Sequence, residues 1–211
     1  MSFFKDKSQL VAKQDALPGR ADALEISGMH TVLATSMRAP FPDDTEVCYF
    51  GMGCFWGAER RLWQQPGVIT TAVGYMAGYT PNPTYDEVCS GMTGHTEVVM
   101  VAYENKASCL ENLLKVFWES HDPTQGMRQG NDQGTQYRSG IYCVNADQLA
   151  IAERSKVDYQ EALKQKGLAP ITTEVMIADE FYYAEEYHQQ YLDKNPSGYC
   201  GLAGTGVSCS I

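Results

Sequence analysis

The chain has 211 residues, of which 44% are hydrophobic and 20% charged, and this composition excludes a disordered or fibrous protein. With 16 Lys and Arg against 26 Asp and Glu, the net charge of −10 argues against binding to nucleic acid or to an anionic membrane surface. The two long uncharged stretches, 62–85 and 195–211, contain too many Gly, Pro, Gln and Asn residues to span a membrane. Since the N-terminus also lacks the apolar segment of a signal peptide, we expect a cytoplasmic protein.

The first half of the chain predicts a long arm followed by regular elements. Residues 1–44 show no sustained periodicity and are interrupted by prolines, so we expect an extended N-terminal arm. The patterns then predict a strand over 46–51, a helix over 54–64, a strand over 68–77, a loop over 78–94 and a strand over 97–103.

The second half predicts two amphipathic helices. Ser108 and Glu111 form a capping box before one helix, and Asn145 is the expected N-cap of the other, which ends near Gly167. Between and after them we expect a polar loop over 121–136, strands over 137–144 and 171–178, a short helix over 181–193, and a loosely held Gly-rich tail over 195–211.

The order of these elements predicts the fold class. From 46 to 144 the order is strand, helix, strand, strand, helix, strand, which is the split βαβ arrangement of the ferredoxin-like fold. We therefore expect an α+β protein with a mixed sheet, in which 45–211 form a single domain that includes the tail.

Seven cysteines occur, and none belongs to a Cys-x-x-Cys pair or to a regular zinc-ligand spacing with a histidine. A structural metal site is therefore not expected, and in a reducing compartment any disulfide would be transient and catalytic. Cys48, Cys109 and Cys143 lie inside predicted strands and helices, which favours small apolar core residues.

Cys54 lies at the turn from a strand to a helix, in Gly51–Gly57. The first turn of a helix carries unpaired N–H groups and a partial positive charge, which favour the thiolate. Phe55 and Trp56 follow directly, and two large aromatic residues at such a turn suggest the lining of a pocket.

Three other interpretations of this region stay open. The glycines of Gly51–Gly57 resemble a loosened dinucleotide fingerprint, although Phe55 and Trp56 would crowd a pyrophosphate. Cys54 could instead be the nucleophile of a hydrolase, with a histidine as base; the candidates are His95, His121 and His188. A binding module without catalysis, in which tyrosines recognise a ligand, is the third.

Two more cysteines lie on the Gly-rich tail. Cys200 and Cys209 bracket a linker flexible enough to bring either sulfur to a distant partner. Two tethered thiols together with an activated thiol match a sulfenic acid chemistry in which resolving cysteines prevent overoxidation.

The segment Gly51–Gly57 (GMGCFWG) resembles the signature of the peptide methionine sulfoxide reductase A family. Further blocks resemble that family in the same order: Gly74–Tyr75, Gly78–Tyr79, Pro83–Tyr85, Val88–Gly91, Gly94–Glu97, Gly130–Ser139 and Tyr182–Glu185. The similarity covers roughly 46–209, and residues 1–44 resemble an extension of some bacterial members.

The resemblance implies roles for residues around the sulfoxide. Cys54 would attack the sulfoxide sulfur and Glu97 would protonate the departing oxygen. Tyr85 and Tyr137 would donate hydrogen bonds to that oxygen, and Asp132 would orient the polar side of the substrate. Phe55 and Trp56 would receive the substrate methyl group. A protonated Glu97 also makes physical sense, because a sulfoxide oxygen leaves poorly unless protonated and burial raises a carboxyl pKa.

The resemblance also implies how the enzyme is recycled. Cys200 would attack the sulfenic acid of Cys54, and Cys209 would then form a disulfide with Cys200, which thioredoxin reduces. The linker before Cys209 is one residue longer than in close bacterial members, so a Cys54–Cys200 disulfide is the alternative substrate of thioredoxin. We expect a monomeric enzyme, without metal or organic cofactor, that repairs methionine S-sulfoxide, free and in oxidised proteins.

Overall fold

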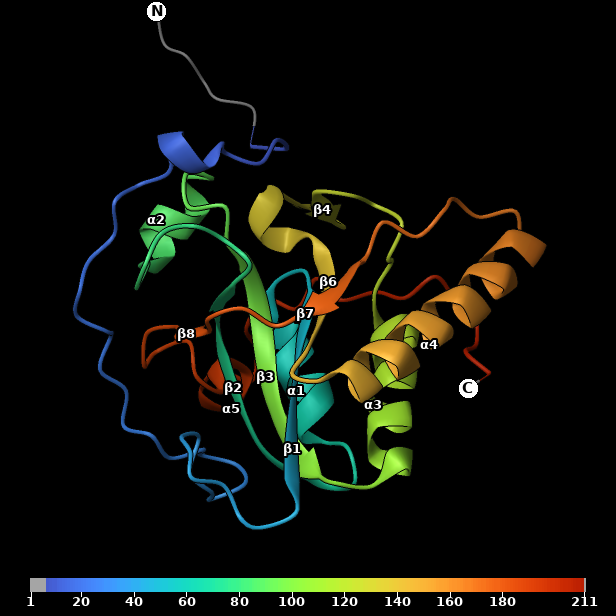
Figure 1. Ribbon diagram of the computed structural model, residues 1–211, viewed down its shortest axis with the longest axis horizontal. Coiled ribbons are helices and arrows are strands. Elements are labelled where there is room, and N and C mark those ends of the chain that lie inside the picture. Colours follow the sequence, from blue (N-terminus) through green and yellow to red (C-terminus); the bar gives the residue numbers. More distant parts are fainter. Residues whose placement is uncertain (1–6, 211) are drawn as a thin grey trace, which may run out of the picture.

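The structure, a computed structural model, describes residues 7–210. Its main element is a six-stranded sheet, which lies at the centre of the molecule (Figure 1). The strand order is β7-β6-β1-β3-β2-β8. The pair β6–β7 is parallel and the other four pairs are antiparallel, so the predicted α+β class with a mixed sheet is confirmed. The bounds are β1 (Thr45–Met52), β2 (Val68–Met76), β3 (Thr96–Glu104), β6 (Ser139–Cys143), β7 (Glu174–Ile177) and β8 (Tyr182–Tyr183).

Three helices cover one face of this sheet. They are α1 (Phe55–Trp63), α3 (Ala107–Ser120) and α4 (Ala146–Gln165), and α3 and α4 lie together beside the sheet in Figure 1. Their apolar side chains form one buried cluster with inward-facing residues of the four central strands. Cys48, Cys109 and Cys143 belong to this cluster, which confirms them as buried core residues. Burial of this surface is the main stabilising contribution to the fold.

The N-terminal arm helps to cover the opposite face. Figure 1 shows residues 7–44 running along the outside of the molecule past α2, with a short 3-10 helix at Lys13–Asp15. Met37 is fully buried against Ala72 of β2 and Met100 of β3. Arg20 forms an ion pair of 2.7 Å with Glu87. The predicted extended arm is therefore packed onto the domain.

Two predicted loops contain regular structure that the sequence patterns missed. The excursion 78–94 includes α2 (Tyr85–Cys89), whose N-terminus is closed by a reciprocal capping box between Thr84 and Glu87. The polar stretch 121–136 includes a small hairpin, β4 (Arg128–Gln129) with β5 (Asp132–Gln133), and a 3-10 helix, Thr135–Tyr137, follows. These elements are too short for hydrophobic periodicity to reveal them.

The predicted caps had different outcomes. Asn145 caps α4, and its side chain accepts a hydrogen bond from the Gln148 N–H. The prediction of a Ser108 capping box is wrong. Helix α3 already begins at Ala107, and its N-cap residue, Lys106, makes no side-chain cap.

The helix predicted over 181–193 is also wrong. Tyr182 and Tyr183 pair with β2 as β8, and only Tyr191–Lys194 are helical, as α5. The left-handed backbone of Gln190, with φ of 47°, prevents a continuous helix, because that conformation cannot propagate an α-helix of L-residues.

The tail is held more firmly than its glycine content predicts. Val207 and Cys209 are 9% and 2% exposed. The Tyr159 hydroxyl donates to the Val207 carbonyl at 3.2 Å, and Glu119 of α3 accepts from the Cys209 N–H at 2.7 Å. Apolar burial and these two hydrogen bonds hold the end of the tail, at Val207 and Cys209, against α3 and α4.

Within the described residues, no helix has both the length and the apolar character needed to cross a membrane.

Candidate active site

Cys54 lies where β1 turns into α1. Gly53 has φ of 87°, and a Cβ atom there would lie 2.6 Å from Gln129 Cβ, so both the conformation and the space require glycine. Cys54 is the N-cap residue of α1 and is half-buried. The sharp turn therefore presents the thiol at the helix N-terminus, as the sequence predicted.

Glu97, near the start of β3, is 1% exposed. Its Oε2 accepts a hydrogen bond of 2.9 Å from the Phe55 N–H, the residue that follows Cys54. Burial raises the pKa of Glu97 to about 8, the Phe55 N–H opposes this rise, and the charge of Asp132 adds to it. The carboxyl group is consequently protonated in most molecules near pH 7.

The prediction that Cys54 is a thiolate is wrong for the substrate-free protein, in which the thiol form is favoured. Burial raises the pKa of this thiol, the negative charge of Glu97 acts in the same direction, and the Trp56 N–H opposes both. Removal of the thiolate from water therefore outweighs the stabilisation by the helix N-terminus.

Phe55 and Trp56 belong to a cluster of aromatic rings at the start of α1. Phe55 is 1% exposed, and Trp56 stacks on Tyr191 with ring centroids 3.9 Å apart. The Trp56 indole N–H donates to His188 Nδ1 at 3.0 Å, and the His188 ring also lies 5.1 Å from that of Phe55. The indole is thus fixed on one face by stacking and at its edge by a hydrogen bond.

Tyr85 and Tyr137 supply hydroxyl groups near Glu97. Tyr85 begins α2, and its N–H donates to Glu185 at 2.8 Å. Tyr137 ends the 3-10 helix Thr135–Tyr137. Burial raises the pKa of both phenols, and the charge of Glu97 raises each further. Both hydroxyls therefore keep their protons at neutral pH and can donate hydrogen bonds.

Asp132 and the tail meet at the same site. The Tyr199 hydroxyl donates to Asp132 Oδ2 at 3.2 Å. The next residue, Cys200, is exposed, and a Cβ atom on Gly57 would lie only 2.7 Å from its sulfur. Gly57 therefore leaves the room that Cys200 occupies against the first turn of α1, and the charge of Cys200 contributes to the raised pKa of Cys54.

Cys209 is held elsewhere. It is 2% exposed, and its backbone is bound to Glu119 of α3. The structure therefore gathers the other eight residues that the resemblance implied, and it holds Cys209 against α3.

The sequence analysis did not identify Tyr75, Glu185 and Tyr191 as site residues, and it gave His188 a different role. Tyr75 and Glu185 are joined by a hydrogen bond of 2.9 Å, and Glu185 also holds Tyr85. His188 and Tyr191 fix Trp56. The high density of aromatic residues over 182–191 was the available signal.

The histidines do not form the nucleophile–base pair of a hydrolase. His95 Nε2 bonds to the Thr80 carbonyl, and His121 bonds to the Phe117 carbonyl and Ser139. His188 uses Nδ1 to accept from Trp56, and burial lowers its pKa to about 4. The dinucleotide interpretation also loses support, because Gln129 occupies the space beside Gly53.

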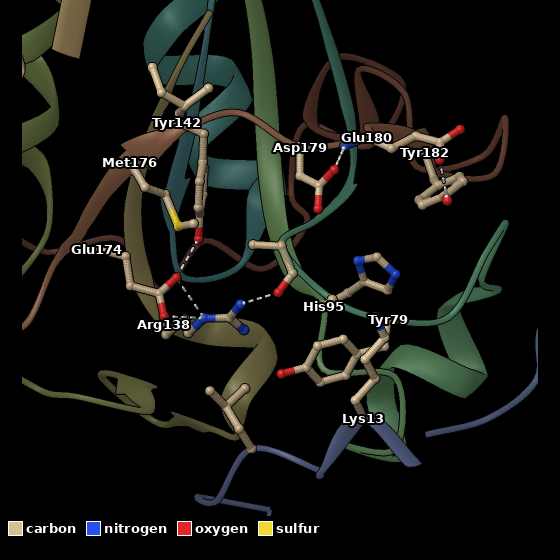
Figure 2. A pocket seen from close by; sticks show the side chains of 14 residues that line it. Lys13, Tyr79, His95, Arg138, Tyr142, Glu174, Met176, Asp179, Glu180 and Tyr182 are labelled. Atoms are coloured by element: carbon tan, nitrogen blue, oxygen red, sulfur yellow. Dashed lines mark hydrogen bonds and ion pairs between the residues drawn. The ribbon is translucent and has the colours of Figure 1, made fainter. Parts of the chain in front are cut away.

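The described side chains form no candidate metal site, and the cavity shown in Figure 2 is not lined by the site residues. In residues 7–210, no group of three His, Cys, Asp or Glu side chains could hold a metal ion. A separate cavity of about 520 Å³ is lined by other side chains, including His95, Arg138 and Glu174 (Figure 2). Arg138 is bound there by Glu174 at 3.0 Å and by the Ala77 carbonyl.

Comparison with known proteins gives a consistent result. The family model for peptide methionine sulfoxide reductase matches residues 46–207. Peptide methionine sulfoxide reductase MsrA 1 of Synechocystis sp. is 60% identical over 99% of this chain and 94% of its own length. MsrA of Brucella ovis is 57% identical over 100% of this chain and 98% of its own.

The fold comparison agrees. Methionine sulfoxide reductase A of Corynebacterium diphtheriae has a TM-score of 0.85 and 46% identity, covering 96% of this chain and 99% of its own. The chain therefore belongs to the peptide methionine sulfoxide reductase family and is an oxidoreductase.

Proposed function

We propose that this enzyme reduces methionine S-sulfoxide, free and in oxidised proteins, through a sulfenic acid on Cys54. The mechanism is supported above all by the state of Glu97. This carboxyl group is fully buried, has a pKa of about 8 and accepts a hydrogen bond from the Phe55 N–H, next to Cys54. It offers a proton at neutral pH beside a thiol.

In the first step, the Cys54 sulfur attacks the sulfoxide sulfur while Glu97 protonates the sulfoxide oxygen. The oxygen moves to Cys54, so that methionine leaves and Cys54 becomes a sulfenic acid; the substrate is reduced and the thiol is oxidised. Glu97 gives one proton to the oxygen and takes up the thiol proton, which balances the step. Because the thiol has a raised pKa, this exchange is needed to form the nucleophile.

The surrounding side chains bind the substrate. Tyr85 and Tyr137 donate hydrogen bonds to the sulfoxide oxygen, since both remain protonated at neutral pH. Asp132 orients the polar side. Phe55 and the fixed indole of Trp56 receive the methyl group, which apolar contact favours.

In the second step, the Cys200 thiol attacks the Cys54 sulfenic acid, a disulfide forms and water leaves. The position of Cys200 against Gly57 supports this role. A reduced thioredoxin then supplies two electrons through its own dithiol. Transfer of the disulfide to Cys200–Cys209 requires the segment around Cys209 to leave α3, and direct reduction of Cys54–Cys200 does not.

We also propose a single catalytic domain over 45–211 with a ferredoxin-like core, supported by the strand order β6-β1-β3-β2 and by helices on one face. The monomeric state, the cytoplasmic location and the independence from a metal or organic cofactor stay predictions.

Single turnover tests the proposed function. Reduced enzyme is mixed with the S or the R epimer of methionine sulfoxide without reductant, and methionine and remaining thiols are counted. We expect stoichiometric methionine from the S epimer with paired loss of thiols. No methionine from either epimer would contradict the proposal.

We predict that Cys200→Ser forms one methionine per enzyme and then stops, because the sulfenic acid has no thiol to condense with. The accumulated Cys54 sulfenic acid is measured by mass spectrometry after labelling with a cyclic dione. Continued turnover with thioredoxin at the wild-type rate would contradict the resolving role of Cys200.

Cys209→Ser separates the two recycling routes. If Cys209 carries the disulfide onward, this variant keeps single turnover and loses thioredoxin-dependent turnover, while a Cys54–Cys200 disulfide accumulates. An unchanged steady-state rate would assign Cys54–Cys200 as the direct substrate of thioredoxin.

A further inference from the structure

Glu59 is a buried carboxyl group that the reaction does not use. It lies on α1, one turn after Phe55, and is 0% exposed. Three hydrogen bonds converge on it: from the Thr71 hydroxyl at 3.0 Å, from the Gln190 backbone N–H at 2.9 Å and from the Gln190 side-chain amide at 2.7 Å. A buried carboxyl group with three hydrogen-bond donors on its two oxygens is well satisfied, so Glu59 links α1, β2 and the segment before α5.

The hydrogen bonds toward Glu59 run in one direction and start in the N-terminal arm. His30 Nδ1 accepts from the backbone N–H groups of Val32 and Leu33, both at 3.1 Å. Since those groups can only donate, the His30 proton is on Nε2 and is donated to the Thr71 hydroxyl at 2.9 Å. The Thr71 hydrogen is then directed to Glu59.

Gln190 lies at the end of this hydrogen-bond network, and its backbone is strained. Its φ of 47° and ψ of 42° are left-handed, a conformation that residues with a side chain rarely adopt. Glu59 binds both its backbone N–H and its side chain. The arm holds the same side chain, because the Thr31 N–H donates to Gln190 Oε1 at 3.3 Å.

The residues on either side of this kink hold Trp56. His188, two residues before Gln190, accepts from the indole N–H, and Tyr191, one residue after, stacks on the indole. A change in the backbone at Gln190 would move both partners relative to Trp56.

We propose that the N-terminal arm positions the substrate pocket: His30, through Thr71 and Glu59, holds the kink at Gln190 and thereby fixes His188 and Tyr191 on Trp56. These are positioning residues, and none of them contacts the reacting atoms. The inference rests on the proposed role of Trp56 in binding the substrate methyl group.

The test uses Thr71→Val, which removes the central hydroxyl and keeps the side-chain shape. 5-Fluorotryptophan replaces the three tryptophans, Trp56, Trp63 and Trp118, so that fluorine NMR reports on each. Ser155→Ala is the matched control, since it removes another buried hydroxyl, bound to the Trp118 indole at 2.9 Å and remote from the pocket.

We expect Thr71→Val to shift the Trp56 resonance and to raise the single-turnover KM for methionine sulfoxide about tenfold, the equivalent of about one hydrogen bond. The maximal rate should change less than about twofold, because the acid and the nucleophile are untouched. Thr71→Ser should restore both values. Ser155→Ala should shift the Trp118 resonance alone.

His30→Phe tests the arm separately, because it keeps an aromatic ring beside Trp63 and removes both nitrogens. It should reproduce the Trp56 shift and the rise in KM. If either variant leaves the Trp56 resonance and KM unchanged, whatever its effect on the melting temperature, the proposal is overturned. Failure of the wild-type enzyme to reduce either epimer would instead remove the proposed function, and the Trp56 resonance would still report the coupling.

Discussion

Cys54→Ser is expected to form no methionine from sulfoxide while remaining fully folded. A serine hydroxyl cannot take the oxygen as a sulfenic acid, so the reaction loses its acceptor. The variant should not lose stability, because Cys54 is the N-cap of α1 without a side-chain cap, and serine at such a position can add up to about 1 kcal/mol. Single-turnover methionine formation and the melting temperature are the two measurements.

The control for this variant is Cys109→Ser, which removes a core thiol outside the site. It should keep the stoichiometric turnover of the wild-type enzyme and can lose stability. Methionine formed by Cys54→Ser at the wild-type level would exclude Cys54 as the nucleophile.

Glu97→Gln is expected to slow the sulfoxide step by roughly 10²- to 10⁴-fold, the usual contribution of a general acid. Glutamine keeps the shape of the side chain, and its carbonyl oxygen can still accept from the Phe55 N–H, so the loss would reflect the missing proton. Single-turnover rates at saturating substrate measure the effect. Glu104→Gln, at the exposed end of the same strand, should leave the rate unchanged.

The raised pKa of Glu97 also predicts how the reaction rate changes with pH. The acid form of Glu97 is active, and its pKa is raised to about 8, so the wild-type rate should be full below about pH 7 and fall as pH rises through 8. Ionisation of the Cys54 thiol, whose pKa is also raised, would instead make the rate increase as pH rises. A rate that increases above pH 8, or a decline retained in Glu97→Gln, would refute Glu97 as the proton donor.

Local patterns predicted most of the central elements. β1, α1, β2 and β3 lie within one residue of their predicted ranges, and α4 begins directly after its predicted N-cap and ends two residues before Gly167. These elements are long, and their hydrophobic periods are set by one face packing on the core. The segments 85–89 and 181–193 were predicted poorly, because α2 and β8 are short and owe their form to contacts with distant residues.

The sequence by itself determined the turn that carries Cys54, because the conformation of Gly53 and the N-terminus of α1 are local properties. Through resemblance to a family, it also indicated Glu97, the tyrosines and Cys200. The tertiary structure decided the protonation states: burial raises the pKa of Cys54 against the helix terminus and keeps Glu97 neutral. It also decided the fixed indole of Trp56, the packed tail and the link from His30 to Gln190. Desolvation and hydrogen bonds between residues far apart in the chain exist only once the fold has formed, so no local pattern encodes them.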